Sequence, residues 1–244
     1  MKKQVGIVLL IAVLGFIGIT LFVGTPKQQV VFEDDRLRKA LLKYDLDDNG
    51  VLTVDEAKQV EILKLPREGN YFNYKGMEAF TNIRELHIKE NKITDLSFLN
   101  SCENLKKIDF SYNHVKDLSP LKACENLESV QFAFNQVTDL SPLTSLTNMT
   151  ELNAIGNRLQ TMAPVSEMKA VKILLLNFNQ IEELSPLEDH PNLEELQILE
   201  NKINSVEPLL TAMNLRKLYV QGIIPIEDYD LLKKHPNYSE RFFQ

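Results

Sequence analysis

The sequence predicts an α/β solenoid: a curved parallel sheet of stacked coils, with a helix-loop-helix cap before it and a helical cap after it. Three observations carry this prediction. Asparagines recur at a fixed interval of 22 residues, apolar residues keep the same interval around them, and an acidic loop flanked by helical patterns precedes the first unit. A fixed period of this size is the sequence signature of a solenoid, in which each unit packs only on its neighbours.

The asparagine column sets the register of the repeat. It consists of Asn91, Asn113, Asn135, Asn157, Asn179 and Asn201. If Met77 is position one, the later units begin at Leu99, Leu121, Leu143, Val165 and Leu187, with a truncated unit at Leu209. The asparagine is then position fifteen, where the chain leaves a strand. Its amide can both donate to and accept from backbone groups that no regular ladder satisfies.

The apolar columns predict one short strand in each unit. Position ten is Leu86, Ile108, Val130, Leu152, Leu174, Leu196 and Leu218, and position twelve is Ile88, Phe110, Phe132, Ala154, Leu176, Ile198 and Val220. Because residues two apart in a strand share a face, both columns point inward while positions nine, eleven and thirteen point outward. We expect seven such strands in a parallel sheet, with proline-bounded turns or single helical turns on the convex side.

The units resemble the internalin-type leucine-rich repeats of bacterial surface proteins. Segments such as Leu118-Ser119-Pro120-Leu121 and Leu140-Ser141-Pro142-Leu143 carry this resemblance, within residues 77 to about 222. It implies a leucine-rich-repeat fold that works by binding another macromolecule. A similar 22-residue repeat occurs in an intracellular regulatory subunit of a eukaryotic phosphatase, so the repeat alone does not fix the compartment.

An acidic segment before the repeats matches the EF-hand calcium loop at each diagnostic position. Its expected calcium ligands are Asp45, Asp47, Asn49, the carbonyl of Val51, Thr53 through a water, and Glu56 with two oxygens. Gly50 would permit the sharp turn. Because the chain has only one such loop, we expect a structural calcium site that fixes the N-terminal cap, with Leu63 and Leu65 in an extra strand. The alternative is an acidic turn that binds nothing.

The N-terminus carries an uncharged apolar run at residues 5–23, preceded by Lys2 and Lys3. Its length predicts a membrane anchor or signal over residues 1–24. The lysines predict a single-pass protein of the cell membrane with the repeats outside; the alternative is a cleaved signal and a secreted protein. The expected further divisions are a linker at 25–32, the cap at 33–64, repeats at 65–222 and a C-terminal cap at 223–244, with a closing helix at 226–234.

The formal net charge of −7 argues against a nucleic-acid surface, which needs a concentrated basic face. We expect instead a monomer that binds a protein or glycan partner on its concave face, with no catalytic activity. The predicted contact residues are outward or edge residues of the later units: Phe134, Ile155, Ile173, Leu175, Phe178, Leu199 and Tyr219. The alternative for the edge aromatic residues is that they pack on one another and shield the strand ends.

Two other functions and the state of the two cysteines remain open from the sequence. A non-catalytic envelope scaffold would have the same repeats. A hydrolase would have to use His87, Asp109 and Ser111, which fall on neighbouring outward positions, although an open strand face offers no oxyanion hole. Cys102 and Cys124 both occupy position four, so they are either small core residues or a disulfide between stacked coils.

Overall fold

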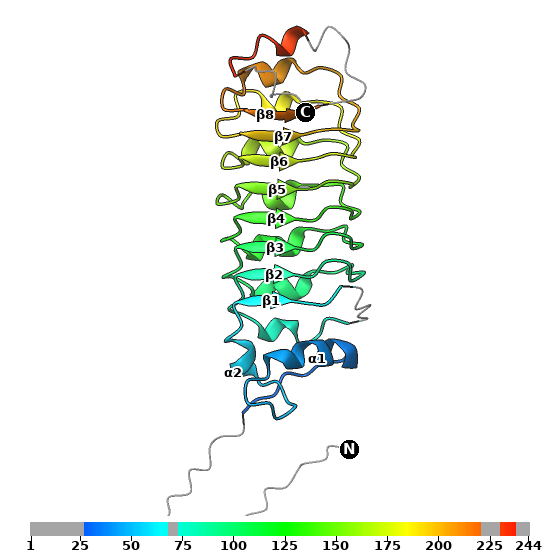
Figure 1. Cartoon of the computed structure of the whole chain (residues 1–244), viewed down its shortest axis with the longest axis vertical. Coiled ribbons are helices and arrows are strands. Elements are labelled where there is room, and N and C mark those ends of the chain that lie inside the picture. The colour runs from blue at the N-terminus through cyan, green and yellow to red at the C-terminus, as the bar shows by residue number, and fades with distance from the viewer. Residues whose placement is uncertain (1–26, 68–72, 221–229, 238–244) are drawn as a thin grey trace, which may run out of the picture.

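The chain forms a single stack of coils in which each coil contributes one strand to a parallel sheet (Figure 1). The computed structural model describes residues 27–67, 73–220 and 230–237. The strands are β1 (Ile62–Lys64), β2 (Glu85–His87), β3 (Lys107–Asp109), β4 (Ser129–Gln131), β5 (Glu151–Asn153), β6 (Ile173–Leu175), β7 (Glu195–Gln197) and β8 (Lys217–Tyr219). They follow one another in chain order across an open sheet, as the repeat predicts.

The strands pair in the register set by the 22-residue repeat. From β2 onward each residue pairs with the residue 22 positions later, as in Glu85 with Lys107 and Leu86 with Ile108. The extra strand expected ahead of the first repeat is β1, in which Leu63 pairs with Leu86. The predicted solenoid fold is therefore confirmed, including its N-terminal extension.

The side of each coil opposite the sheet is a short 3-10 helix. These helices are η2 (Met77–Ala79), η3 (Ser97–Ser101), η4 (Ser119–Ala123), η5 (Ser141–Leu143), η6 (Ala163–Glu167), η7 (Ser185–Leu187) and η8 (Glu207–Thr211). From η4 onward a proline stands at their start, where its fixed φ suits a helical turn and its missing N–H costs no bond. This agrees with the expected single helical turns.

The core fills the space between sheet and 3-10 helices. Positions ten and twelve are buried in every coil, and the Phe110 and Phe132 rings stack inside the core with centroids 5.6 Å apart. Cys102 and Cys124 are free and buried among them, so they are core residues and not a disulfide. Burial raises the pKa of the Cys102 thiol to about 11 and, with the neighbouring Cys102, that of Cys124 to about 12.

From Asn113 onward, each asparagine of position fifteen ties its own coil to the coil before it. The Asn135 amide group donates to the carbonyls of Phe132 in the same coil and Phe110 in the preceding one, both at 3.1 Å. Its Oδ1 accepts the backbone N–H of Val115 at 2.9 Å. The same bonds recur at Asn113, Asn157, Asn179 and Asn201. The predicted role of the column is confirmed.

A second asparagine column, at position six, was not predicted. Asn126, Asn148, Asn192 and Asn214 each donate to a backbone carbonyl 23 residues earlier, at distances from 2.6 to 3.3 Å. These side chains are exposed, whereas those of position fifteen lie in the interior. The 22-residue spacing of this column was visible in the sequence and could have revealed it.

The N-terminal cap is a helix-loop-helix unit that covers the first coil. Helix α1 (Asp35–Leu41) starts at the N-cap Asp34, whose carboxylate accepts from the N–H groups of Arg36 and Leu37, and it is followed by the 3-10 helix η1 (Leu42–Tyr44). Helix α2 (Val54–Ala57) is only one turn long. The Tyr44 hydroxyl accepts from Lys64 N at 3.0 Å and donates to Ile62 O at 3.3 Å, so it protects the free edge of β1.

The segment 230–237 covers the other end of the core. Residues 230–232 are helical and Leu232 is buried, while the rest of the helix expected at 226–234 lies outside the described residues. His235 and Asn237 bond to the Ala212 and Met213 carbonyls at 3.2 and 2.6 Å. His190-Pro191-Asn192 has the same sequence pattern and makes the same kind of contacts, with the Met168 and Lys169 carbonyls. The cap therefore packs as the first part of a further coil would.

The expected single-pass membrane location is not supported by the structure. No helix in ranges 27–67, 73–220 and 230–237 is long and apolar enough to cross a bilayer. Residues 5–23, on which that expectation rested, lie outside the described residues.

Loss of one interior asparagine should loosen the contact between two coils. We expect Asn135→Ala to lower the free energy of unfolding by about 1–3 kcal/mol, because it leaves buried backbone groups without partners. Asn148→Ala is the matched control and should cost less than about 1 kcal/mol, since its amide is exposed and its bond to Glu125 O is 3.3 Å long. Urea unfolding measures both; equal losses would contradict the assigned role.

Stability should also depend on two buried histidines. His190 and His235 are almost fully buried, and burial lowers the pKa of both imidazoles. As the pH falls below about 6.5, the unfolded chain takes up protons that the folded chain does not, so the folded state loses stability. His190→Leu should therefore weaken the difference in unfolding midpoint between about pH 8 and about pH 5.5. An unchanged pH dependence would contradict this.

Candidate functional site: the sheet face and the cap loop

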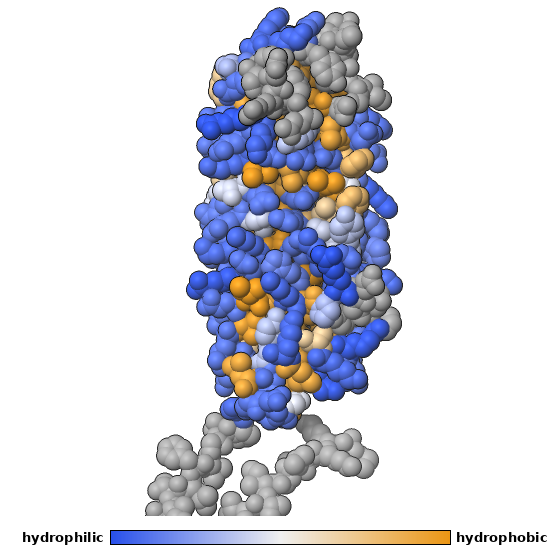
Figure 2. All heavy atoms as spheres, in the orientation of Figure 1, coloured by the Kyte–Doolittle hydropathy of each residue, from blue (hydrophilic) through white to orange (hydrophobic). Residues whose placement is uncertain are grey.

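The outward face of the sheet changes character along the stack. In β2 and β3 it carries charged side chains, whereas the later coils carry Ile155, Ile173, Leu175, Leu199 and Tyr219, all partly exposed. Ile155 and Leu199 stand two residues after the ends of β5 and β7. Register places Ile173 between Glu151 and Glu195, and Leu175 between Asn153 and Gln197. Figure 2 shows apolar side chains exposed in a band at the level of β5 to β7. The structure thus brings the predicted sheet-face residues onto adjacent coils.

The predicted edge residues Phe134 and Phe178 are exposed but do not lie on the sheet face. They occupy position fourteen, as does Tyr112, and their exposed fractions are 43%, 54% and 52%. The Tyr112 and Phe134 rings stack with centroids 4.7 Å apart. A Cβ on Gly156 would lie 2.6 Å from the Phe134 ring, so that ring rests on the next coil because glycine stands there. For Tyr112 and Phe134, the structure therefore agrees with the alternative in which the edge aromatic residues pack on one another.

Position fourteen has a left-handed backbone throughout the repeats. Glu90, Tyr112, Phe134, Gly156, Phe178 and Glu200 all have φ between 53° and 67°. This conformation costs free energy for a bulky side chain and is tolerated only where the surroundings enforce it. Aromatic residues are thus kept at the edge against a local backbone preference.

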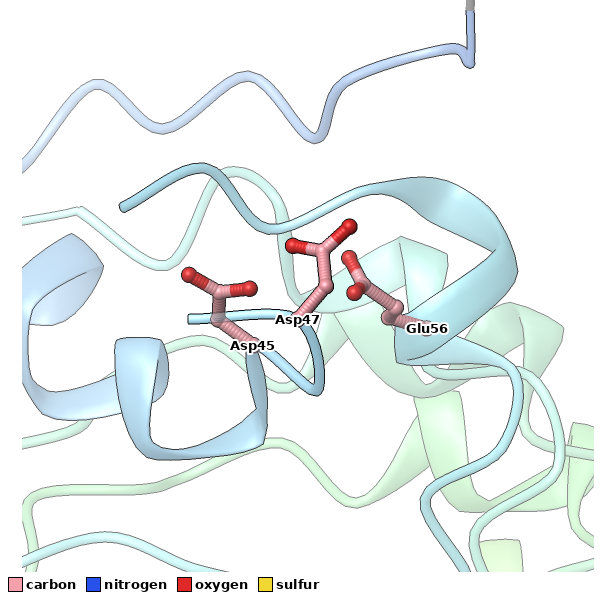
Figure 3. A group of neighbouring side chains, drawn as sticks. All are labelled: Asp45, Asp47 and Glu56. Atoms are coloured by element: carbon pink, nitrogen blue, oxygen red, sulfur yellow. The ribbon is translucent and has the colours of Figure 1, made fainter. Parts of the chain in front are cut away.

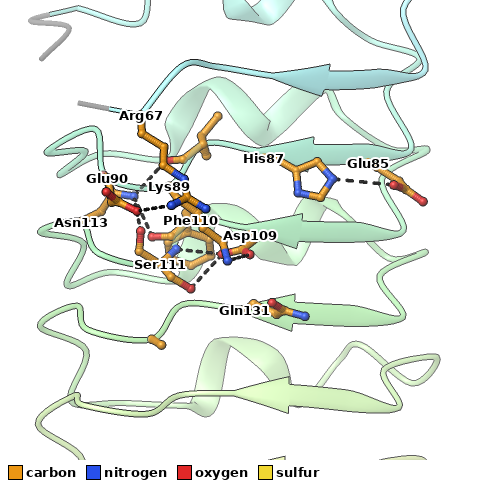
Figure 4. A network of polar contacts seen from close by, with 12 residues as sticks. Arg67, Glu85, His87, Lys89, Glu90, Asp109, Phe110, Ser111, Asn113 and Gln131 are labelled. Carbon is orange, nitrogen blue, oxygen red and sulfur yellow. Dashed lines mark hydrogen bonds and ion pairs between the residues drawn. The ribbon is translucent and has the colours of Figure 1, made fainter. Parts of the chain in front are cut away.

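The residues of the hydrolase alternative do not form a connected triad (Figure 4). The Ser111 hydroxyl donates to Asp109 Oδ1 at 2.8 Å, and Lys89 Nζ lies 2.6 Å from Asp109 Oδ2. His87 points to Glu85 instead, with Nε2 3.7 Å from its carboxylate. Asp109 and Ser111 are also buried, and Lys89 pairs with the Asp109 carboxylate. The arrangement is an ion-paired network.

The cap loop gathers three carboxylates (Figure 3). One oxygen from each of Asp45, Asp47 and Glu56 lies within 4.8 Å of the others. Gly50 has φ +81°, the left-handed turn for which glycine was expected, and its N–H donates to Asp45 Oδ2 at 2.7 Å. Asp45 Oδ1 is buried and, within the described part of the chain, accepts no hydrogen bond. These features suit a cation that prefers oxygen ligands.

Other loop residues are already engaged with the protein. Glu56 accepts from Thr53 N and Thr53 Oγ1 at 2.9 and 2.6 Å, and from Leu46 N at 3.2 Å. The bond from Thr53 N belongs to a capping box at the start of α2, which is completed by Glu56 N donating to Thr53 Oγ1 at 3.3 Å. The two bonds from Thr53 lower the pKa of Glu56. Asn49 Oδ1 accepts from Val51 N at 2.8 Å. Both Thr53 bonds end on Glu56 Oε2, whereas Oε1 accepts only from Leu46 N, so Oε1 keeps a lone pair with which Glu56 can act as a ligand while it caps the helix.

Two features of the loop were not predicted. Val30 N donates to Leu52 O at 2.9 Å and Val54 N to Gln28 O at 2.8 Å, so the segment before α1 pairs with the end of the loop. Lys27 Nζ lies 3.4 Å from Asp47 Oδ2, with both side chains exposed. The apolar pair Val30-Val31 was a weak strand signal that could have indicated the first of these.

Comparisons with known proteins agree with this architecture. The family described as Leucine Rich repeats (2 copies) matches residues 81–123. The crystal structure of an internalin C2 from Listeria monocytogenes superposes with a TM-score of 0.65 and 24% identity, covering 81% of this chain and 99% of that chain. The chain has an internalin-like leucine-rich-repeat fold.

A second Listeria monocytogenes internalin, inlF, shares 19% identity with a TM-score of 0.43, over 91% of this chain and 94% of that chain. None of the curated proteins compared matches the chain. The family match spans residues 81–123, whereas the stacked strands β2 to β8 extend from Glu85 to Tyr219.

Proposed function

We propose that this leucine-rich-repeat chain is a binding module that recognises a protein partner on the sheet face of its later coils. The observation that carries the proposal is the row of apolar side chains from β5 to β8 on an otherwise polar face. A contiguous exposed apolar patch of roughly a few hundred Å² often marks an interaction surface, because leaving it in water is unfavourable.

The surroundings of the patch favour a protein over a small molecule. Ile173 and Leu175 stand on rigid, paired strands, and Glu151 and Glu195 flank Ile173 on either side. Glu151 accepts from Ser129 and Gln131 at 3.1 and 3.2 Å, while Glu195 pairs with Lys217 at 3.1 Å. An apolar centre with a hydrogen-bonded polar border is the usual composition of a protein interface.

We also propose that calcium stabilises the N-terminal cap. Asp45, Asp47, Asn49, Glu56 and the Val51 carbonyl would hold the ion, which supplies positive charge where three carboxylates converge. The unpartnered Asp45 Oδ1 supports this. Thr53 is less suited to its expected role, since its hydroxyl bonds to Glu56. Because the cap covers the first coil, its stability limits that of the whole stack.

The partner proposal is tested by charge reversal of the patch. Ile173→Glu/Leu175→Glu should abolish capture of the partner from a surface extract, because each glutamate would have to be desolvated in the interface. Ile62→Glu is the matched control, since Ile62 is an exposed apolar residue of β1 at the other end of the stack. Equal capture by the double variant and the wild type would contradict the proposal.

The calcium proposal is tested by calorimetry and thermal unfolding. We expect millimolar calcium, about the affinity range of extracellular sites, to raise the unfolding temperature relative to chelator. Asp47→Asn should remove most of this increase. Asp55→Asn is the control, because Asp55 is an exposed carboxylate of the same segment outside the cluster. Identical unfolding in calcium and chelator would refute a stabilising ion.

A further inference from the structure

The flank of the solenoid that follows the interior asparagines is chemically distinct from the sheet face. Positions fourteen and sixteen stand on either side of the inward-pointing asparagine, and both are mainly exposed. Position sixteen is Lys92, His114, Gln136, Arg158, Gln180 and Lys202, a column of hydrogen-bond donors without an acidic residue. Next to it stand the exposed rings of Tyr112 and Phe134.

This flank is held in register by its own backbone bonds. From His114 onward, the N–H of position sixteen donates to the position-seventeen carbonyl of the preceding coil, as Gln136 N does to Val115 O and Arg158 N to Val137 O, both at 2.9 Å. The side chains of successive coils are therefore presented at the spacing of the stack, which is about 5 Å.

The charge of the flank is opposite to that of the chain. The whole sequence has a formal net charge of −7, yet the exposed positions around the two rings carry His114, Lys116 and Arg158. Within the described ranges, Lys116 and Arg158 form no ion pair. The next acidic residues along the chain after the two rings are Asp117 and Asp139. Their carboxylates accept from Ser119 N and Ser141 N at 2.8 Å, so they are turned toward the 3-10 helices and away from the flank.

We propose that this flank, formed by Tyr112, His114, Lys116, Phe134, Gln136 and Arg158, binds an anionic polysaccharide. Aromatic rings offer apolar surface for the C–H faces of sugars, and the amide of Gln136 can bond to hydroxyl groups. Unpaired cations beside them select a chain with carboxylate, sulfate or phosphate groups. The open, repeating geometry suits an extended polymer of repeating charge. This surface is separate from the proposed protein site on β5 to β8.

The left-handed backbone at Tyr112 and Phe134 adds support. Many polar residues, or glycine as at Gly156, would satisfy this conformation with less strain than an aromatic ring. The two rings nevertheless keep 52% and 43% of their surface exposed. The stacked pair therefore packs along the edge of the sheet and still leaves about half of each ring open to a ligand.

The experiment measures binding of defined oligosaccharides to the full chain by calorimetry at low salt. The probes are an oligogalacturonate, a neutral maltooligosaccharide of the same length, and polyglutamate as an acidic polypeptide. We expect binding of the oligogalacturonate alone, weakened by added salt. Tyr112→Ala and Arg158→Glu should each lower its affinity on the order of tenfold.

Two controls keep the outcome interpretable. Lys169→Glu makes the same change in net charge at an exposed position-five residue that precedes the strand, and it should leave affinity within about twofold. Ile173→Glu/Leu175→Glu should also retain binding, which separates this site from the proposed protein site. Urea unfolding verifies that each variant is folded. The proposal is overturned if the oligogalacturonate does not bind, if polyglutamate binds as well, or if Tyr112→Ala and Arg158→Glu bind like the wild type.

Discussion

The interior asparagine of each coil is the constraint on which the rest of the structure depends. Asn135 bonds to Phe132 in its own coil and to Phe110 and Val115 in the preceding coil, so one side chain fixes the distance and register between two turns of the chain. Backbone groups that turn away from a short strand would otherwise be buried without partners. A stack of three-residue strands is stable because these amides continue the ladder where the strands end.

The same constraint shapes the surfaces available for binding. The residue before each asparagine is left-handed in coil after coil, which turns position fourteen out at the sheet edge. The sheet face and the flank therefore carry different side chains although they lie only a few residues apart. From β5 onward the face carries apolar side chains among polar ones, whereas the flank combines exposed rings with unpaired cations. These two surfaces of different chemistry are the basis of the two separate binding sites that we propose.

Much of the fold could be predicted because the repeat encodes it at each level. The spacing of Asn91 to Asn201 gave the register, and alternation around positions ten and twelve gave the strands and core. Side-chain contacts between coils were harder to predict, because they depend on which residues are stacked in neighbouring coils. Examples are the ion pair of Lys89 with Asp109 and the packing of the Phe134 ring on Gly156. In the loop, the ligand spacing and the turn at Gly50 were readable, but the pairing of Gln28 and Val30 with its end involves residues far apart in sequence. The expected membrane location was wrong for the described chain.

Amide hydrogen exchange tests the central role of the asparagines most directly. The N–H groups of Val115, Val137, Leu159 and Ile181 are each accepted by an asparagine Oδ1 of the next coil at 2.9 to 3.1 Å. If these bonds hold the stack together, these amides should exchange only through global unfolding, like the sheet amide of Phe132, which donates to Asn153 O at 2.9 Å. Exchange as fast as that of the turn amide of Thr144, which is half-buried and makes only a 3.3 Å bond to Ser141 O, would contradict the account.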